Sequence, residues 1–388
     1  MSLRILFLDH GTKPVGGGQI NTLSLLRGLD RSRFTPLVLS AQENAFTQAA
    51  QAAGVTVTIM PLPVALTRLG RDSVRYDPIH LALYCWHAGR AALRLSRLVR
   101  QEQIDVLHPC DNLMRILSAV VAIKTKTPVV CPIMEEFTPG LTSRLLRRFF
   151  MVTMSYVLPV SERAAAFFRA TTAGKARVVV TYTGIELNQF TDLVAEAGRR
   201  ERRARYGEAL VVGIVGRLVP IKGHRQLLEA LALLKQTGGT PFHCLIVGDG
   251  PEREALGGVV SELRLDDQVS FIAFQNDIAR IMSLMDVVAA PSLTEASSRV
   301  VLEAGALGVP SVATRVGGIP EMVLDGVTGI LVDAGDTPGL ARALLTLADA
   351  SVRERMGGQA RRRVREMFAN DLITRKIESV YLSAADGR

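Results

Sequence analysis

The stretch PSLTEASSRVVLEAGALGVPSVATRVGGIPE, residues Pro291 to Glu321, carries two glutamates, Glu295 and Glu303, with seven residues between them. The short apolar run Asp286 to Ala290 just before it is typical of a buried parallel strand. The run Val300 to Leu307 predicts a helix, closed by a glycine and a proline. Glu295 is therefore expected in the loop at the carboxyl end of the strand, and Glu303 inside the helix. Open α/β sheets bind ligands at that corner, where the N–H groups of a helix start favour an anion. Taken alone, the pair also fits a surface loop with two solvated glutamates.

Length and composition favour a large globular protein with two domains. The chain has 388 residues, 48% of them hydrophobic, which is enough for more than one core. Its four cysteines form no C-x-x-C pair, which argues against a disulfide framework or a zinc site and fits a reducing compartment. The apolar run Leu145 to Val160 is broken by two arginines and a proline, so we predict no membrane span there. These features predict a cytoplasmic protein.

The net charge of +9 is unevenly distributed along the chain. Residues 1–190 hold 22 Lys and Arg against 12 Asp and Glu, whereas residues 191–388 hold 24 against 25. The excess in the first half predicts an anionic partner or surface there. We do not expect nucleic acid, because the sequence has no recognisable binding motif and no basic strand face rich in aromatic residues.

Both halves alternate short apolar strands with amphipathic helices, the pattern of parallel sheets covered on both faces. We predict an α/β protein with two doubly wound Rossmann-like domains that face each other across a cleft. The expected domains are residues 1–190 and 191–368, followed by a C-terminal helix, residues 369–388, that returns to the first domain. The segment Asn188 to Arg203, where the apolar pattern lapses and charges cluster, is the expected hinge.

The second domain opens with a strand end that suits a diphosphate. In VVGIVGRLVPIKGHRQ, residues Val211 to Gln226, a strand ends at Gly216 and a helix starts near Gly223. Arg217 and Lys222 are therefore expected beside a helix N-terminus, where charge-assisted hydrogen bonds are worth about 1.5–3 kcal/mol each. Two exposed basic residues on an ordinary loop are the alternative.

The first strand of the chain is followed by three glycines. Gly16, Gly17 and Gly18 open a helix, which lets the backbone approach a phosphate or a sugar closely. The run is neither a G-x-G-x-x-G fingerprint nor a Walker loop, so an ordinary loop remains an alternative.

Taken together, these motifs resemble a family-4 glycosyltransferase of the GT-B fold, and the resemblance covers nearly the whole chain. Each motif alone is weak, but their order and spacing are specific. After the three glycines, the matching elements are VGRLVPIKG (Val215 to Gly223), VGDGPERE (Val247 to Glu254), FIAFQNDI (Phe271 to Ile278), MDVVAAPS (Met285 to Ser292), E-x7-E (Glu295 to Glu303) and GGIPEMV (Gly317 to Val323).

The resemblance implies retaining transfer of a sugar from a nucleotide diphosphate donor, a UDP- or GDP-sugar, with no cofactor and no metal ion. It implies that Arg217 and Lys222 bind the diphosphate and stabilise its developing charge, and that Glu295 holds the donor sugar as the third catalytic residue. It also implies that Glu303 holds the ribose hydroxyls, that the Phe274 region borders the base and that the three glycines close over the phosphates. The implied donor-binding set is Gly16, Gly17, Gly18, Gly216, Arg217, Lys222, Phe274, Glu295, Ser297, Ser298, Arg299, Val300 and Glu303.

Three departures from the family pattern concern the sugar and the acceptor. The loop after Glu295 is usually rich in glycine and phenylalanine, whereas here it reads ASSR. His108 is kept, but Cys110 stands where many members have a second histidine. Glu135, or Met134 beside it, occupies the position where many members place a histidine over the sugar. We assign His108 and Glu135 to the acceptor or sugar side, although His108 would equally suit a satisfied strand end.

The expected acceptor is a glycan or a lipid-linked molecule, in cell-surface polysaccharide or glycolipid synthesis. Two other functions remain open: a catalytically silent nucleotide-sugar-binding subunit, and a nucleotide-sugar epimerase of the same fold. Retention of the basic residues and both glutamates argues against the first. The pairing of E-x7-E with the basic loop favours transfer over the second.

Two basic segments predict that the first domain docks on an anionic membrane surface at the inner face of the cytoplasmic membrane. Arg90, Arg94, Arg97 and Arg100 recur at spacings of four, three and three, so they lie along one side of a helix. The segment Arg144 to Phe150 places cations beside large apolar side chains. Each basic side chain near anionic lipid contributes about 1 kcal/mol, so together they would support reversible binding. A solvated helix face is the alternative.

Overall fold

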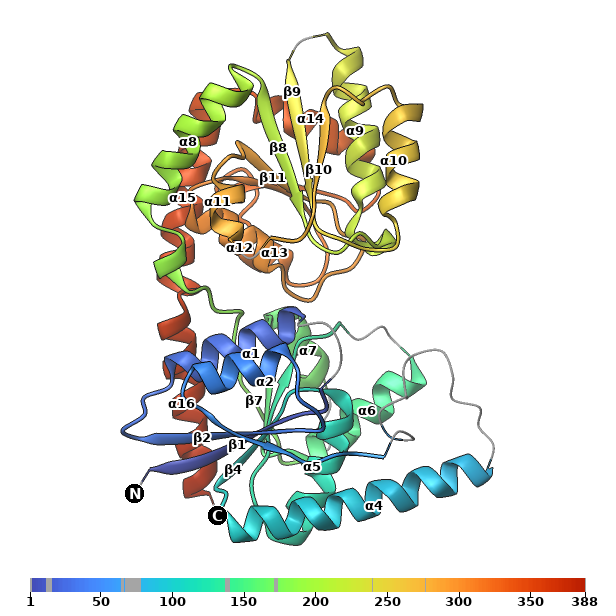
Figure 1. The fold of residues 1–388 in the computed structure, drawn as a ribbon, viewed down its shortest axis with the longest axis vertical. Coiled ribbons are helices and arrows are strands. Elements are labelled where there is room, and N and C mark those ends of the chain that lie inside the picture. The colour runs from blue at the N-terminus through green and yellow to red at the C-terminus, as the bar shows by residue number, and fades with distance from the viewer. Residues whose placement is uncertain are drawn as a thin grey trace. The chain divides into compact units, whose positions relative to one another are not determined.

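The computed structural model describes residues 2–11, 16–63, 66, 78–136, 140–170, 174–238, 240–275 and 277–387. Its internal contacts divide the chain into two compact units (Figure 1). Unit 1 comprises Met1–Val160, Ala164–Gly184 and Asn370–Arg388, and unit 2 comprises Ser161–Arg163 and Ile185–Ala369. The main change from one unit to the other thus falls at residues 184 and 185, six residues before the predicted boundary.

The strands of unit 1 run parallel, in the order β3-β2-β1-β4 and β5-β6-β7. An isolated parallel bridge between Leu107 and Val129 joins the two groups. The strand order therefore reverses between β1 and β4, which is where doubly wound sheets bind ligands. The strands are β1 (Leu3–Asp9), β2 (Phe34–Ser40), β3 (Thr56–Ile59), β4 (Val106–Pro109), β5 (Val130–Ile133), β6 (Tyr156–Pro159) and β7 (Arg177–Val178).

Helices cover both faces of this sheet, because successive side chains of a strand point to opposite sides. Ile5 and Phe7 of β1 pack into a core with α1, α2 and α16, and Leu6 and Leu8 pack into another with α4, α5 and α6. The C-terminal helix α16, red in Figure 1, contacts α1 and so belongs to unit 1. The helices are α1 (Gly17–Gly28), α2 (Ala45–Ala52), α4 (Pro78–Gln101), α5 (Asn112–Thr125), α6 (Leu141–Thr153), α7 (Glu162–Arg169) and α16 (Asn370–Asp386).

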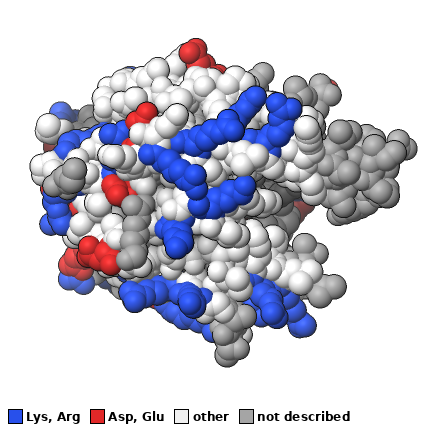
Figure 2. Space-filling view, turned by 90° about the horizontal axis from the view of Figure 1, so that it is seen from below, with Lys and Arg blue, Asp and Glu red and all other residues white. Residues whose placement is uncertain are grey.

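The surface formed by α4, α5 and α6 is basic. None of these three helices contains an Asp or Glu in its sequence. Figure 2, which views the molecule from the side of α4, shows more Lys and Arg than Asp and Glu on this face. Among the described residues, no helix combines the length and the apolar character needed to cross a membrane.

Unit 2 is a second doubly wound sheet, with parallel strands in the order β10-β9-β8-β11-β12-β13. Its strand order reverses between β8 and β11. The strands are β8 (Leu210–Val215), β9 (Phe242–Val247), β10 (Val269–Ile272), β11 (Val287–Ala290), β12 (Ser311–Thr314) and β13 (Gly329–Val332). The helices are α8 (Asp192–Tyr206), α9 (His224–Gln236), α10 (Arg253–Glu262), α11 (Ile278–Met282), α12 (Arg299–Ala306), α13 (Ile319–Met322), α14 (Thr337–Thr346) and α15 (Ala350–Met367). The predicted fold class, α/β with two doubly wound Rossmann-like domains, is confirmed.

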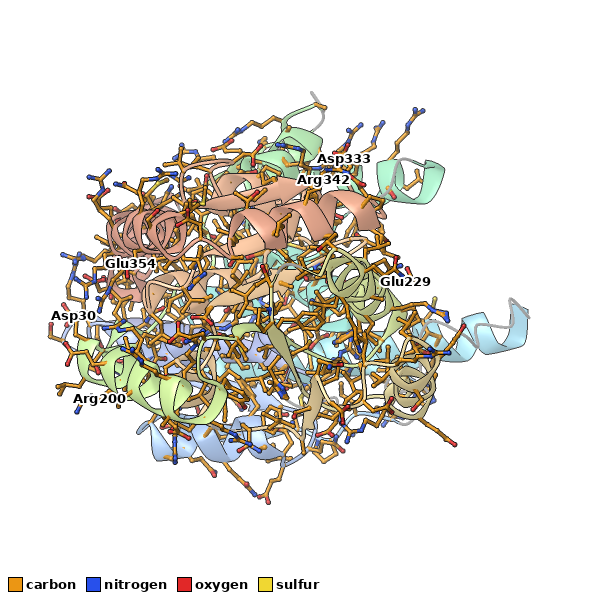
Figure 3. All side chains as sticks on the ribbon, turned by 90° about the horizontal axis from the view of Figure 1, so that it is seen from above. Asp30, Arg200, Glu229, Asp333, Arg342 and Glu354 are labelled. Atoms are coloured by element: carbon orange, nitrogen blue, oxygen red, sulfur yellow. The ribbon has the colours of Figure 1, made fainter. Side chains whose placement is uncertain are left out.

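The predicted hinge is wrong for most of its length, because α8 occupies it from Asp192 onward. The hydroxyl of Thr191 accepts a hydrogen bond from Val194 N at 3.3 Å and caps the helix. Gly198 is buried, and a Cβ built there would lie 2.0 Å from Ser283 Oγ, so the helix packs closely on its neighbour. The charged residues that hid this helix form its solvated side, and Figure 3 labels one of them, Arg200.

Candidate functional site

Lys222 and Glu295 meet at the carboxyl edge of the unit 2 sheet, where the strand order reverses. Lys222 ends the short 3-10 turn η2 (Pro220–Lys222) after β8, and Glu295 lies in the loop between β11 and α12. Lys222 Nζ forms an ion pair with Glu295 Oε2, and the hydroxyl of Ser292 lies 3.4 Å from the same oxygen. The two side chains remain 29% and 14% exposed. Two loops that are far apart in the sequence thus build one site.

Gly223 allows these two loops to pack closely. Its φ of +75° lies in the left-handed region that favours glycine. A Cβ built at Gly223 would lie 2.0 Å from the carbonyl oxygen of Pro291, which follows β11 directly. Any side chain at this position would therefore push the turn that carries Lys222 away from the loop that carries Glu295.

Arg217 and Phe274 lie on loops that follow β8 and β10, at the same carboxyl edge of the unit 2 sheet, and both are open to solvent. The Arg217 side chain is exposed and has no carboxylate partner in the described part of the chain. The Phe274 residue is 69% exposed, and its backbone N–H donates to Asp249 Oδ2 at 2.9 Å. A Cβ built at Gly248, just before Asp249, would lie 2.1 Å from the carbonyl oxygen of Gly216. The loops after β8, β9 and β10 are thus packed together, and the Arg217 guanidinium, which has no carboxylate partner among the described residues, is available to an anion.

Glu303 is buried in α12 and held there by Arg299. Arg299 Nε donates to Glu303 Oε1 at 3.1 Å. Burial raises the pKa of the Glu303 carboxyl, and the Arg299 guanidinium opposes that rise. The helix starts at Arg299, with Ser298 as its N-cap residue, Ser297 before it and Val300 in its first turn. A carboxylate fixed in this way can accept hydrogen bonds from neighbouring hydroxyls of a ligand.

His224, which the sequence interpretation missed, is the first residue of α9 and follows the Lys222 turn. The side chain is buried, and neither ring nitrogen has a hydrogen-bond partner within the described residues. Burial, with a smaller contribution from the Lys222 charge, lowers the pKa of His224 to about 4. The imidazole is therefore neutral at pH 7. The sequence could have indicated that His224 belongs to the site, because it follows the predicted phosphate-binding Lys222 by two positions.

In unit 1 the glycine run lies where α1 begins. Gly16 and Gly17 are exposed, and no described atom lies within 4 Å of a Cβ built at either one. A Cβ at Gly18 would lie 3.3 Å from Met134 Sδ, just after β5. The run thus presents accessible backbone beside the carboxyl end of the unit 1 sheet.

The two residues assigned to the acceptor or sugar side have partners within unit 1. His108 is buried, its Nδ1 lies 2.8 Å from the hydroxyl of Tyr381, and burial lowers its pKa to about 3. It also borders a cavity of 40 Å³. This environment matches the alternative of a satisfied strand-end histidine. Glu135 forms an ion pair with the fully buried Arg115, at 2.8 Å.

A cluster at the ends of β1 and β4 was also missed. His10 Nδ1 lies 2.8 Å from Asp111 Oδ2, and Gln19 Nε2 donates to Asp9 at 3.2 Å. The hydrogen bond with Asp111 raises the pKa of His10, and burial raises the pKa of Asp9. Both strand ends lie where the strand order of the unit 1 sheet reverses. Doubly wound sheets bind ligands at such a point, and the same rule, which predicted the position of Glu295, could have predicted this cluster.

The fold and part of the sequence match known proteins. The fold matches that of the Anabaena HepE protein, solved with UDP and glucose, with a TM-score of 0.79, 23% identity and coverage of 98% of this chain and 100% of that one. Residues 209–350 match the family described as "Glycosyl transferases group 1".

Two curated relatives match this chain over different lengths. The N-acetyl-alpha-D-glucosaminyl L-malate synthase of Bacillus anthracis is 40% identical over 138 residues, which are 35% of this chain and only 36% of that protein. The D-inositol 3-phosphate glycosyltransferase of Corynebacterium efficiens is 30% identical over 327 residues, which are 81% of this chain and 73% of that protein. That extended match, together with the family assignment of the second unit, shows that the chain belongs to the group 1 glycosyltransferases.

Proposed function

We propose that this protein transfers a sugar, with retention of configuration, from a UDP- or GDP-sugar to a glycan or lipid-linked acceptor. The observation that carries the proposal is the Lys222–Glu295 ion pair at the point of strand reversal, together with Arg217, which lies on the same loop as Lys222 and has no ion-pair partner among the described residues. A silent binding subunit would bind the donor without consuming it, and an epimerase would act on the donor without an acceptor.

The ion pair suggests how donor binding prepares the site. A diphosphate would attract both Lys222 and Arg217, and so draw the ammonium group away from Glu295. The released carboxylate could then accept hydrogen bonds from hydroxyls of the donor sugar, with the N–H groups at the start of α12 beside it. As the glycosidic bond breaks, the two cations would stabilise the negative charge that moves onto the leaving diphosphate.

A screen of the purified protein against nucleotide sugars by thermal shift tests the donor class. UDP-glucose is the first compound to try, because the Anabaena HepE protein has been solved with UDP and glucose. We expect one nucleotide sugar to raise the melting temperature and to be consumed when an acceptor extract is added. Consumption without any new glycosylated product would favour the epimerase, and binding without consumption would favour the silent subunit.

Replacing Glu303 by alanine is expected to weaken binding of the nucleoside diphosphate by about tenfold or more, because two hydrogen bonds from ribose hydroxyls to a charged acceptor would be lost. Titration calorimetry measures this change. Glu354→Ala, a substitution of another helical glutamate in unit 2 with an exposed side chain, is the control. An unchanged affinity in Glu303→Ala would contradict the ribose role.

We also expect transfer to need no divalent metal, because the charge of the diphosphate would be met by Arg217 and Lys222. Among the described residues, no three His, Cys, Asp or Glu side chains are grouped as metal ligands would be. Activity measured in EDTA should equal activity in magnesium. Loss of activity in EDTA that magnesium or manganese restores would show that this interpretation of the site is wrong.

The basic surface of unit 1 supports a peripheral location on the inner face of the cytoplasmic membrane. The arginines of α4 at positions 90, 94, 97 and 100 are exposed, and large apolar side chains emerge among the basic residues. Trp86 is 45% exposed on α4, Ile123 75% on α5 and Leu145 60% on α6. These helices pack side by side, since α5 contacts both α4 and α6. Cations mixed with exposed apolar groups suit the boundary between anionic headgroups and acyl chains.

The double substitution Arg97→Ala and Arg100→Ala is expected to lower binding to anionic liposomes by about thirtyfold, at about 1 kcal/mol for each lost cation. Co-sedimentation at two salt concentrations measures this. Arg199→Ala with Arg200→Ala, a pair of exposed arginines on α8 of unit 2, is the matched control and should bind like the wild type. Binding that does not change with the content of anionic lipid or with the salt concentration would contradict the membrane proposal, and so would the absence of binding.

A further inference from the structure

Unit 1 contains a second cavity, of 220 Å³, that none of the site residues described above lines. One wall is the segment Met60 to Pro63, which continues directly from β3. The other wall is α4, through His87, Arg90, Ala91 and Arg94. The carboxyl ends of β3 and β1 lie on the same edge of the parallel sheet. The cavity therefore opens at the edge where doubly wound sheets bind their ligands.

Helix geometry directs three hydrogen-bond donors toward this cavity. His87 and Arg94 are seven positions apart, which places them within about 20° of each other around the helix axis. Arg90 lies within about 60° of both. Arg97 lies within about 20° of Arg90 around the axis but about two turns farther along the helix, and neither Arg97 nor Arg100 lines the cavity. The arginines of α4 thus divide into a pair at the cavity and a pair on the outer surface.

The charges at the cavity are not neutralised by any residue that the structure describes. Neither Arg90 nor Arg94 has an ion-pair partner in the part of the chain that the structure describes. Arg90 lies 5.2 Å from the centre of the Trp86 ring, which leaves the N–H groups of its guanidinium plane free. Arginine side chains bind phosphate through two parallel hydrogen bonds, which lysine cannot do.

Size and lining fit a phosphoryl group attached to a larger molecule. The 220 Å³ volume equals about seven water molecules at roughly 30 Å³ each, so it can hold a phosphate and the first atoms of its substituent. The wall opposite the arginines carries Met60, Leu62 and two prolines. Such a wall offers apolar contact to the substituent rather than competing charge.

We propose that this cavity binds a phosphoryl group of the acceptor, so that the acceptor is a phosphate ester or a phosphodiester. The inference rests on the proposed transferase function. Two strand spacings of about 4.8 Å separate β3 from β1, so roughly 10 Å lies between the cavity and the strand end that carries Asp9. One acceptor molecule can span this distance, with its phosphate in the cavity and its hydroxyl groups at the reversal point of the sheet.

The test uses glycerol 1-phosphate as the probe, titrated by calorimetry into the full-length protein with UDP or GDP present to fill the donor site. We expect binding to the wild type and a loss of about tenfold or more in His87→Ala with Arg94→Ala. The matched control, Arg97→Ala with Arg100→Ala, should bind the probe like the wild type. Equal binding to wild type and the His87/Arg94 variant would overturn the proposal.

Two further arms separate the outcomes. Nucleotide binding is titrated in the same variants and should be unchanged, which also shows that they are folded; if no nucleotide binds even the wild type, the transferase function fails and the cavity result stands by itself. Probe binding that is lost in Lys222→Ala but kept in the His87/Arg94 variant would place the phosphate at the donor site and overturn the proposal.

In the last arm of the test, vesicles of phosphatidylcholine with phosphatidic acid replace glycerol 1-phosphate. Both double variants remove cations that face the membrane, so capture must fall further in the His87/Arg94 variant than in the Arg97/Arg100 variant to assign the phosphoryl group to a lipid headgroup in the cavity. Equal losses in the two variants, without binding of glycerol 1-phosphate, would overturn the proposal. Binding of neither overturns the proposal.

Discussion

Lys222→Ala is expected to lower the rate of sugar transfer by about a hundredfold or more while the protein stays folded. A hydrogen-bond donor that stabilises charge in the transition state lowers the activation free energy by about 3–4 kcal/mol. Lys222 lies on a surface turn and is not part of the apolar core of unit 2, so its loss should leave that core intact. Arg217→Ala should lower the transfer rate by a similar factor, because Arg217 is proposed to contact the same diphosphate. The variant should also fold, because the exposed guanidinium has no structural partner among the described residues.

Rates of nucleoside diphosphate release, with circular dichroism as the check on folding, measure this effect. Arg225→Ala is the matched control, since this exposed cation follows Lys222 by three positions and pairs with Glu229 at 3.7 Å. It should transfer at the wild-type rate. Near-normal turnover by folded Lys222→Ala would remove the basis of the proposed site.

Gly223→Ala is expected to be the most damaging of the small substitutions considered. The new methyl group would lie 2.0 Å from the carbonyl oxygen of Pro291, and alanine would have to adopt a φ of +75°. The left-handed conformation costs about 1–2 kcal/mol and overpacking about 1–3 kcal/mol more. We expect the free energy of unfolding to fall by about 2–5 kcal/mol. Activity should fall as well, because the Lys222 turn must move.

Urea denaturation and transfer assays together test this. Gly258→Ala is the control: it changes a glycine of α10 at which a Cβ would meet no described atom within 4 Å. Since alanine favours helix, this variant should be as stable as the wild type or more stable. A Gly223→Ala protein with unchanged stability and rate would show that the close approach of the two loops is unimportant.

The elements around the site could be predicted from the sequence because each has an unambiguous local pattern. Strand β11 is a continuous apolar run that ends at a proline, and the observed strand starts one residue after the predicted one. Helix α12 starts one residue earlier than predicted, and α9 starts directly after Gly223. A strand buried on both faces is marked by a short continuous apolar run, and a helix end is marked by a glycine. Both patterns can be recognised from a few consecutive residues.

Other features could not be predicted, because they depend on residues far apart in the chain or on burial. The partners Lys222 and Glu295 are 73 positions apart, and only the parallel sheet order brings their loops together. Helix α8 was missed because its exposed charges mask a buried side made of small residues such as Gly198. The neutral state of His224 follows from its burial, which no local pattern of residues reveals.

The central claim is that the loops after β8 and β11 of unit 2 bind a nucleoside diphosphate. Titration calorimetry with UDP and GDP, on the wild type and on Lys222→Ala, tests it most directly. The account predicts that one of the two nucleotides binds the wild type with one site per chain, and that Lys222→Ala weakens this binding by about tenfold or more. Binding of neither nucleotide, or equal affinity in wild type and variant, would contradict it.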